Sequence, residues 1–149
     1  MSLQVSPDAP RLRCASHYDL ELIFEALLRL HDKSPAKQMK LCEPEVAYRN
    51  LVQARSEGRL YVYGDYGIFI DVGSPWHTSK RVLIEEIVIR FRKAYSNDVD
   101  SAIQQLTVIG RSHGCVAVAA GDTQIGLMAP RYLAAGFEAL GTQFYKEIA

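Results

Sequence analysis

Residues 130–148 read PRYLAAGFEALGTQFYKEI and form the most informative stretch of the sequence. Pro130 suits the first turn of a helix, because its missing N–H would have no partner there. Gly136 supplies the left-handed residue that ends a helix, and Phe137 then supplies a side chain for a core. Residues 141–148 continue as a predicted strand. The stretch therefore predicts a short helix, a glycine stop and a strand in immediate succession.

Bulk composition is that of an ordinary globular protein. The 149 residues are enough for one domain with its own core, and 48% of them are hydrophobic and 23% charged. We expect a flexible tail at residues 1–10 and a single domain over residues 11–149. The 17 basic residues balance 17 acidic ones, which argues against a nucleic acid or an anionic membrane surface as partner. No apolar run approaches the roughly 20 residues that span a bilayer.

The chain has three cysteines, Cys14, Cys42 and Cys115. They lie far apart in the sequence, and no Cys-x-x-Cys or Cys/His spacing suits a ligand set, so the sequence predicts no metal site. An odd number of scattered cysteines is typical of reduced thiols, which indicates a cytoplasmic protein.

The rest of the sequence predicts a succession of helices and strands. Ser16 and Asp19 form a capping box at the start of the first helix, and Gly64 and Asp65 form the turn of an antiparallel hairpin. The expected elements are a strand at 11–13, helices at 16–31 and 43–58, strands at 60–63, 66–72 and 81–90, a helix at 97–114, a buried strand at 115–120, and the closing helix and strand. The order β-α-α-β-β-β-α-β-α-β predicts a single-domain α/β fold, in which a mixed, mostly antiparallel central sheet is flanked by helices.

The spacing of Tyr132, Gly136 and Phe137, together with this element order, resembles the GNAT superfamily of acyl-CoA N-acyltransferases. The resemblance covers residues 11–148, and the glycine-free segment after the central strand is similar to phage-type members. It implies a GNAT-like fold and direct transfer of an acetyl group from acetyl-CoA, used as a co-substrate, to an amine in a ternary complex. It also implies a small amine or a peptide amino group as acceptor, and a homodimer, which is common in the family.

The resemblance assigns the chemistry to a tyrosine and a glutamate. Tyr132 becomes the acid that protonates the departing thiolate, since a phenol with a pKa near ~10 can give up its proton there. Glu85 and Glu86 interrupt a long apolar strand, and burial would raise the pKa of such a carboxylate toward that of a base. Adjacent residues of a strand point to opposite faces, so one of the two faces the cleft; Glu85 is preferred, and Glu86 stays open. The alternative is an ion pair with Arg81 or Lys80 on an exposed face.

The coenzyme is expected along the end of the central strand and the segment after it. Backbone donors of Ile87, Val88 and Ile89 would polarise the thioester carbonyl. The helix that follows would offer its N-terminal N–H groups to the pyrophosphate. The residues expected to surround the pyrophosphate are Arg90, Arg92, Lys93, Ala94, Tyr95, Ser96 and Asn97.

This segment lacks the glycines of the family motif. Arg90, Arg92 and Lys93 would supply charge in their place, whereas Asp98 and Asp100 favour the helix dipole and repel phosphate. Two interpretations stay open: a cradle that works by direct charge, or a capped helix beside a solvated basic edge. The second supports an alternative function, in which a GNAT-fold protein without catalytic activity binds a ligand or serves as a structural component, for example in a phage.

Overall fold

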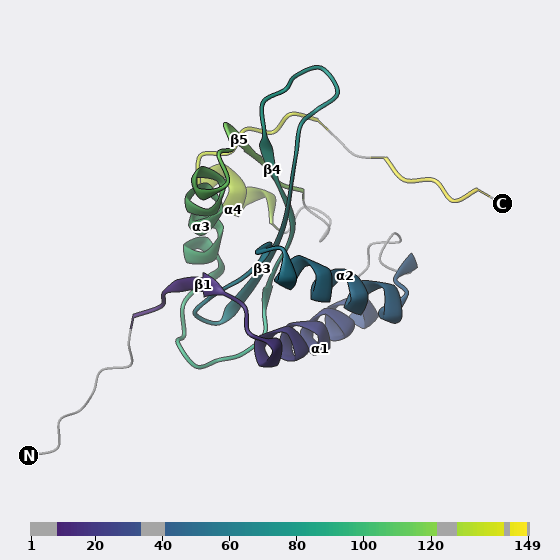
Figure 1. The fold of residues 1–149 in the computed structure, drawn as a ribbon, viewed down its shortest axis with the longest axis vertical. Coiled ribbons are helices and arrows are strands. Elements are labelled where there is room, and N and C mark those ends of the chain that lie inside the picture. The colour runs from purple at the N-terminus through teal and green to yellow at the C-terminus, as the bar shows by residue number, and fades with distance from the viewer. Residues whose placement is uncertain (1–8, 34–40, 122–127, 142–143, 149) are drawn as a thin grey trace, which may run out of the picture.

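The computed structural model describes residues 9–33, 41–121, 128–141 and 144–148. Its elements are β1 (Leu12–Cys14), α1 (His17–Lys33), α2 (Pro44–Ser56), β2 (Leu60–Tyr63), β3 (Tyr66–Gly73), β4 (Val82–Arg90), α3 (Val99–Ser112), β5 (Ala117–Ala119) and α4 (Ala129–Ala134). As far as α4 they follow the order expected from the sequence (Figure 1). The expected N-terminal tail lies outside the described residues except for its last two positions.

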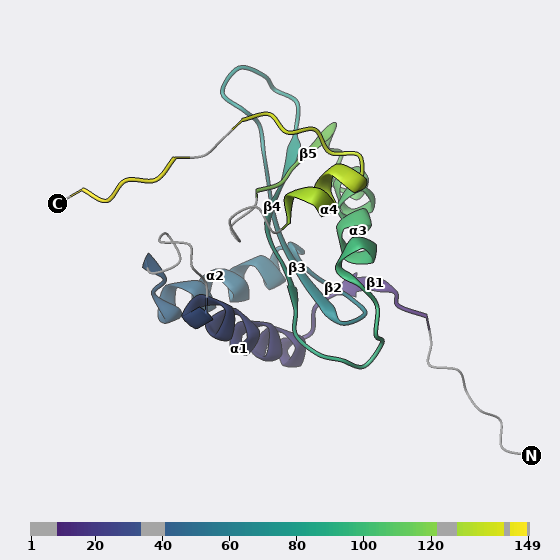
Figure 2. The same ribbon diagram turned by 180° about the vertical axis from the view of Figure 1, so that it is seen from behind.

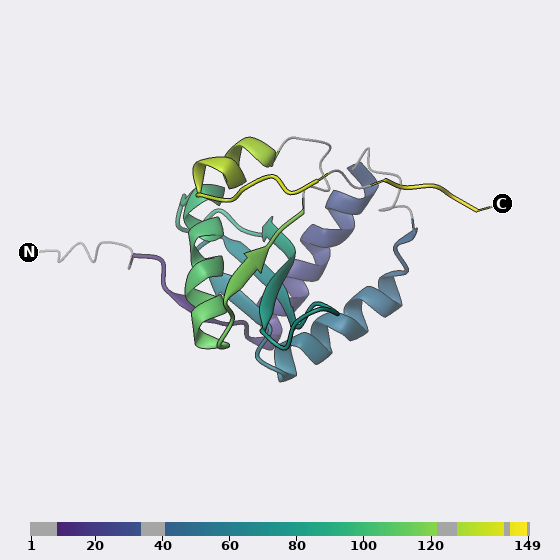
Figure 3. The same ribbon diagram turned by 90° about the horizontal axis from the view of Figure 1, so that it is seen from above.

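The strands form one five-stranded sheet in the order β1-β2-β3-β4-β5. The first four strands pair with their neighbours in antiparallel fashion, and β5 lies parallel to β4. Helices α1 and α2 cover one face of the sheet, and α3 and α4 cover the other, as the view from above shows (Figure 3). The expected α/β fold with a mixed, mostly antiparallel sheet is confirmed.

Each face of the sheet has its own apolar core. Under α1 and α2 the fully buried side chains are Leu20, Ile23, Leu51, Leu60 and Val62. Under α3 and α4 they are Ile68, Ile70, Leu83, Ile103, Leu106 and Ile109. The helices contribute residues three and four positions apart, which is the spacing of a helix with one apolar face.

A β-bulge in β4 changes the face to which its side chains point. The register with β3 shifts between Glu85 and Ile87, so Glu86 is an extra residue in the ladder. Leu83 packs under α3, whereas Ile87 packs under α1 and α2 although it lies an even number of positions further on. Glu86 therefore falls outside the regular alternation of the strand, whereas Glu85 keeps the alternation that begins at Leu83.

Two helix starts show how the local sequence positions the later site. The capping box of α1 is confirmed, since Ser16 Oγ accepts from the N–H of Asp19 at 3.1 Å and Asp19 Oδ2 accepts from the N–H of Ser16 at 2.8 Å. α3 begins at Val99 instead of position 97, after the N-cap residue Asp98.

No helix in the described part of the chain is long and apolar enough to cross a bilayer.

The expectations for the last two strands are wrong in part. The described residues of 137–148 form no strand, and the chain leaves the body of the protein there (Figure 2). β5 spans three residues instead of 115–120, and it is mostly exposed instead of buried. Both differences have one cause: in the described residues no strand covers the outer edge of β5, and a strand forms only where a neighbour completes its hydrogen bonds.

Candidate active site

Tyr132 and Glu85 meet between β4 and α4. The Tyr132 hydroxyl donates a hydrogen bond to Oε2 of Glu85, with 3.1 Å between the oxygen atoms. The tyrosine is buried, with 8% of its surface exposed, so the phenol lies where little water competes for it. The two residues that the sequence assigns to acid and base chemistry are thus in direct contact.

α4 holds Tyr132 in this orientation. The helix has Pro130 in its first turn and is followed by Gly136, whose φ of +92° lies in the region that favours glycine. The N–H of Phe137 donates to the carbonyl oxygen of Tyr132 at 3.0 Å. The two rings also pack edge to face, with centroids 5.4 Å apart. The predicted helix, glycine stop and core phenylalanine are confirmed.

The carboxyl group of Glu85 titrates near neutrality. Burial raises its pKa to about 7, because removing water disfavours the charged form. The hydrogen bond from Tyr132 and the backbone N–H groups of Gly121 and Val88 act in the opposite direction, and the charge of Glu86 adds to the increase. A pKa close to the ambient pH is what a general base requires.

Glu86 has a different environment. It is the extra residue of the bulge and is exposed. Burial raises its pKa, the charge of Asp71 raises it further, and the charge of Arg59 lowers it. No ion pair joins either glutamate to Arg81 or Lys80 among the interactions of the described residues.

A cleft opens where β4 and β5 diverge. In the described residues the two strands pair only over Val82–Ile84 and Ala117–Ala119. Beyond these pairs lies a cleft of about 320 Å³, whose walls include both glutamates, Ile87 and Val88 of β4, and Tyr132 of α4. Ile89 lies instead in the core under α1 and α2. The expected coenzyme role of these three β4 residues stays a prediction.

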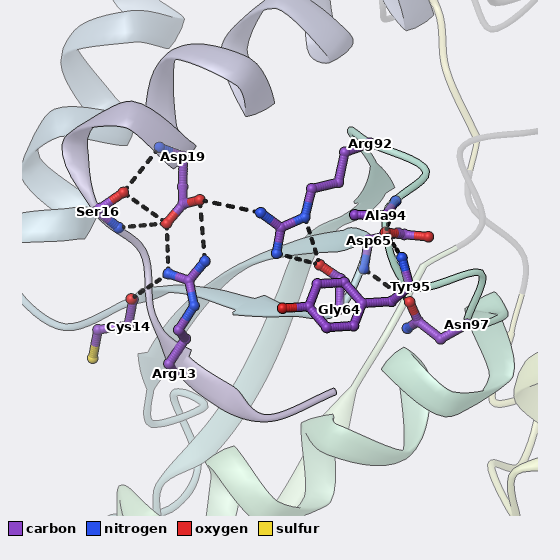
Figure 4. A network of polar contacts seen from close by, with 10 residues as sticks. All are labelled: Arg13, Cys14, Ser16, Asp19, Gly64, Asp65, Arg92, Ala94, Tyr95 and Asn97. Atoms are coloured by element: carbon purple, nitrogen blue, oxygen red, sulfur yellow. Dashed lines mark hydrogen bonds and ion pairs between the residues drawn. The ribbon is translucent and has the colours of Figure 1, made fainter. Parts of the chain in front are cut away.

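The segment between β4 and α3 closes around a single carboxylate. Asp65, in the turn between β2 and β3, is fully buried. It accepts hydrogen bonds from the backbone N–H groups of Ala94, Tyr95 and Ser96 at 2.7, 2.8 and 2.8 Å (Figure 4). Ser96 has a φ of +56°, and successive N–H groups in such a conformation form a concavity that binds anions. Here the anion is a side chain of the same protein.

The turn that contains Asp65 makes several contacts with the segment between β4 and α3. Burial acts to raise the pKa of Asp65, but the three backbone donors and the charge of Arg90 outweigh it, so the pKa lies below its usual value. The N–H of Asp65 donates to Oδ1 of Asn97 at 2.8 Å. A Cβ at Gly64, whose φ is +58°, would lie only 2.3 Å from that Oδ1 atom. The turn therefore accepts glycine at this position and no larger residue without a shift of Asn97.

The two arginines expected near the pyrophosphate are engaged within the protein. Arg92 donates from Nε and Nη2 to the carbonyl oxygen of Gly64 at 3.0 and 2.8 Å, and its Nη1 lies 3.9 Å from Asp19. Figure 4 shows this guanidinium between the two partners. Arg90 lies with Nη2 3.5 Å from Oδ2 of Asp65. Both cations therefore neutralise internal carboxylates.

The first turn of α3 also carries its own anions. Oδ1 of Asp98 accepts from the N–H of Ser101 at 2.9 Å, which is the N-cap bond. Asp100 forms an ion pair with Arg131 of α4, with 2.9 Å between nitrogen and oxygen. Lys93 is exposed. The structure thus brings Glu85 and Tyr132 together, while the expected pyrophosphate residues other than Lys93 contact groups of the protein itself.

Asp65 is the site residue that sequence reasoning missed. A Gly-Asp pair between two strands is fully accounted for by a hairpin turn, so nothing near it pointed to a further role. The one indirect signal is the segment after β4, which has no glycine and still has to satisfy its backbone donors. In the described residues no group of three or more His, Cys, Asp or Glu side chains could hold a metal ion.

Comparisons with known proteins identify the fold. A possible acetyltransferase from Clostridium difficile 630 has a TM-score of 0.71 at 12% identity, and the match covers 95% of this chain and 99% of that one. A predicted acetyltransferase from Clostridium acetobutylicum, solved with acetyl-CoA, has a TM-score of 0.64 at 13% identity and covers 93% and 96%. An aminoglycoside acetyltransferase from an uncultured soil metagenomic sample, solved with sisomicin, has a TM-score of 0.60 at 14% identity and covers 94% and 97%.

These likenesses extend over nearly the whole chain, so the GNAT-like fold is confirmed. At such identities they show the fold alone. The structures named give no support to a phage relationship. No protein-family model matches the sequence, and no curated protein matches it.

Proposed function

We propose that this chain, which has the fold of the GNAT acetyltransferases, is an N-acyltransferase that moves an acetyl group from a coenzyme A thioester to an amine. The observation that carries the proposal is the hydrogen bond between Tyr132 and Glu85 at 3.1 Å, inside the cleft between β4 and β5. An acid and a base in contact inside a cleft are what acyl transfer between a thioester and an amine requires.

Glu85 removes the proton of the attacking amine. Its pKa of about 7 lies close to neutral pH, so the carboxylate can accept the proton and its conjugate acid can return it. As the amine nitrogen bonds to the acyl carbon, its N–H proton passes to the Glu85 carboxylate. Glu86, exposed on the bulge, remains the alternative base.

Tyr132 protonates the leaving group. As the bond between carbon and sulfur breaks, the phenol gives its proton to the thiolate. The protonated Glu85 then returns a proton to the Tyr132 oxygen along the same hydrogen bond, so both side chains end the cycle as they began it. The net change is one N–C bond formed, one C–S bond broken and one proton moved from nitrogen to sulfur. Backbone donors of β4 near Ile87 would stabilise the carbonyl oxygen during the attack.

The acceptor in this proposal is a small amine or a peptide amino group. Glu86 and Asp71 lie close enough for the charge of one to raise the pKa of the other, and such a pair of carboxylates favours a cationic acceptor. The three free cysteines support a reducing, cytoplasmic setting as part of the same proposal.

The test is release of free thiol from acetyl-CoA with a panel of amines that includes a polyamine, an aminoglycoside and a short peptide. We expect Tyr132→Phe to lower kcat by about 100-fold or more, because general acid catalysis typically contributes that much, with unchanged binding of acetyl-CoA in calorimetry. The matched control is Tyr145→Phe, which removes the same hydroxyl from an exposed residue.

Two results would contradict the proposal. One is a Tyr132→Phe variant that turns over like the wild type. The other is a wild-type protein that neither binds acetyl-CoA nor acetylates any amine, which would leave the GNAT-fold binding or structural protein without catalytic activity as the function.

A further inference from the structure

The anion site between β4 and α3 is already filled. Three consecutive N–H groups, those of Ala94, Tyr95 and Ser96, converge on the carboxylate of Asp65 within 2.8 Å. Asp65 has no exposed surface, and its own N–H is held by Asn97 at 2.8 Å. A diphosphate could use these donors only if a buried, hydrogen-bonded carboxylate first left them.

The charges around this site do not favour a second anion. Arg92 is held by the Gly64 carbonyl and Asp19 (Figure 4). Arg90 lies with Nη2 3.5 Å from Oδ2 of Asp65. The start of α3, where helix polarity attracts anions, already carries two carboxylates of its own, one in the N-cap bond and one in an ion pair. A diphosphate at this position would therefore meet the carboxylate of Asp65 and the two carboxylates at the start of α3.

The cleft between β4 and β5, in contrast, suits the thioester end of a donor. It contains the Tyr132–Glu85 pair and apolar β4 side chains on one wall. Its volume of about 320 Å³ is at the lower end of the roughly 300–1,000 Å³ found for small-molecule sites. It therefore suits a narrow chain with a thioester at its end, and it leaves a bulky nucleotide outside.

We propose that this protein recognises its acyl donor through the pantetheine thioester arm alone, because Asp65 occupies the site where a GNAT fold would hold the nucleotide diphosphate. The inference rests on the proposed function and names its donor class: a thioester on a pantetheine arm, whether that arm belongs to coenzyme A or is attached to a carrier protein. Asp65 acts here as a specificity-determining residue.

The experiment compares donors on the same purified protein. Dissociation constants and kcat/KM are measured for acetyl-CoA, S-acetyl-4′-phosphopantetheine and S-acetyl-pantetheine, and an acetylated acyl carrier protein is added as a fourth donor. We expect the three small donors to agree within tenfold, and Lys93→Ala to leave their ratios unchanged. Higher kcat/KM for the carrier protein would identify it as the source of the arm, and equal or lower kcat/KM would identify free thioesters.

A variant of Asp65 tests whether this carboxylate prevents recognition of the nucleotide diphosphate. Asp65→Asn removes the charge and frees one backbone donor, so we expect acetyl-CoA to gain at least fivefold in affinity over S-acetyl-pantetheine. Asp32→Asn, which removes the same charge at an exposed position, should leave that ratio as in the wild type. Thermal melting followed by circular dichroism establishes whether Asp65→Asn is folded. If this variant does not fold, the inference is tested by the comparison of donors on the wild type and on Lys93→Ala.

Different results would contradict the inference, the role of Asp65 and the proposed function. A wild-type preference for acetyl-CoA of tenfold or more over S-acetyl-pantetheine overturns this inference and leaves the proposed function in place. An unchanged ratio in folded Asp65→Asn overturns the role of Asp65. Absence of binding and turnover with every donor overturns the proposed function, and this inference with it.

Discussion

A carboxylate at position 85 stands in the middle of an apolar strand, and its surroundings explain why it is tolerated there. Glu85 follows Leu83 by two positions, so it lies on the side of the sheet that α3 and α4 cover. Tyr132 supplies one hydrogen bond to it, and a buried carboxyl that is neutral part of the time costs less than a permanent charge. A side chain that would otherwise destabilise the strand thus becomes a titrating group in a cleft.

Glu85→Gln tests this titration. Since the base has to be ionised, we expect wild-type kcat/KM to rise with pH through about 7, the pKa of Glu85, and to reach a plateau above it. The glutamine variant should lose that limb of the profile and most of its kcat, by roughly 100-fold. A profile that keeps its inflection near pH 7 in the variant would assign the titration to another group, and Glu86→Gln is the parallel measurement.

Among the elements, α1 shows how a local motif becomes part of a larger network. The capping box of Ser16 and Asp19 forms as the sequence predicts, and the same carboxylate accepts from Arg13 of the segment before the helix at 2.6 Å. Arg92 approaches it from the segment after β4 at 3.9 Å. The start of α1 is thereby connected to the loop that closes around Asp65.

Asp19→Asn isolates the charge in this network, because asparagine also caps helices. Burial acts to raise the pKa of Asp19, but Arg13 and Ser16 outweigh it and lower the pKa to about 2. A pKa below the unfolded value adds stability above about pH 4 that is lost as the pH falls toward 2. We expect the variant to lose about 2 kcal/mol of unfolding free energy at pH 7.

The check is urea unfolding of wild type and Asp19→Asn between about pH 2 and pH 7. The two curves should converge as the pH approaches 2, because the wild-type carboxylate is then protonated as well. Asp32→Asn, at an exposed site, should follow the wild type throughout. A difference between wild type and Asp19→Asn that stays constant over this range would show that the charge contributes nothing.

The residues after α4 differ in burial. Phe137 packs against the core under α3, whereas Phe144 and Ile148 are 93% and 95% exposed. We expect Phe144→Ser and Ile148→Ser each to change the unfolding free energy by less than about 0.5 kcal/mol. Phe137→Ser should cost more than about 1 kcal/mol, since it removes buried apolar surface. Thermal melts of the three variants are the measurement, and a large loss from either exposed position would contradict the arrangement.

At the scale of the whole molecule, the sheet divides the protein into two cores. One lies under α1 and α2, the other under α3 and α4, and the Tyr132–Glu85 pair belongs to the second side. Residues with no shared neighbours contribute independently to stability. The site can therefore be altered without disturbing the packing of the opposite face.

Ile23→Val and Ile109→Val test this independence. Both isoleucines are fully buried, one in each core. Each substitution should cost about 0.5–1.5 kcal/mol, and the double variant should lose the sum of the two within about 0.5 kcal/mol. Denaturant unfolding of the single and double variants gives the three numbers. A coupling above about 1 kcal/mol would mean that the two cores respond as one.

Local patterns in the sequence predicted most of the helices and strands, including the two elements that carry Tyr132 and Glu85. Periodicity, the capping box and the glycine after α4 are local signals, because each depends on residues within one or two turns of the chain. They predicted the order as far as α4 and placed Tyr132 in a helix and Glu85 on the central strand. Their roles were implied by a family resemblance, and the contact between them appears only in the tertiary structure.

Three other features depend on contacts between residues that lie far apart in the sequence. The role of Asp65 depends on a turn meeting a loop about thirty positions later. The face of Ile87 depends on a register shift against β3. Among the described residues, no strand lies along the outer edge of β5, although the sequence predicts one over 141–148. Each of these depends on which distant backbone groups satisfy one another, and hydrogen-bond partners far apart in the sequence leave no local pattern.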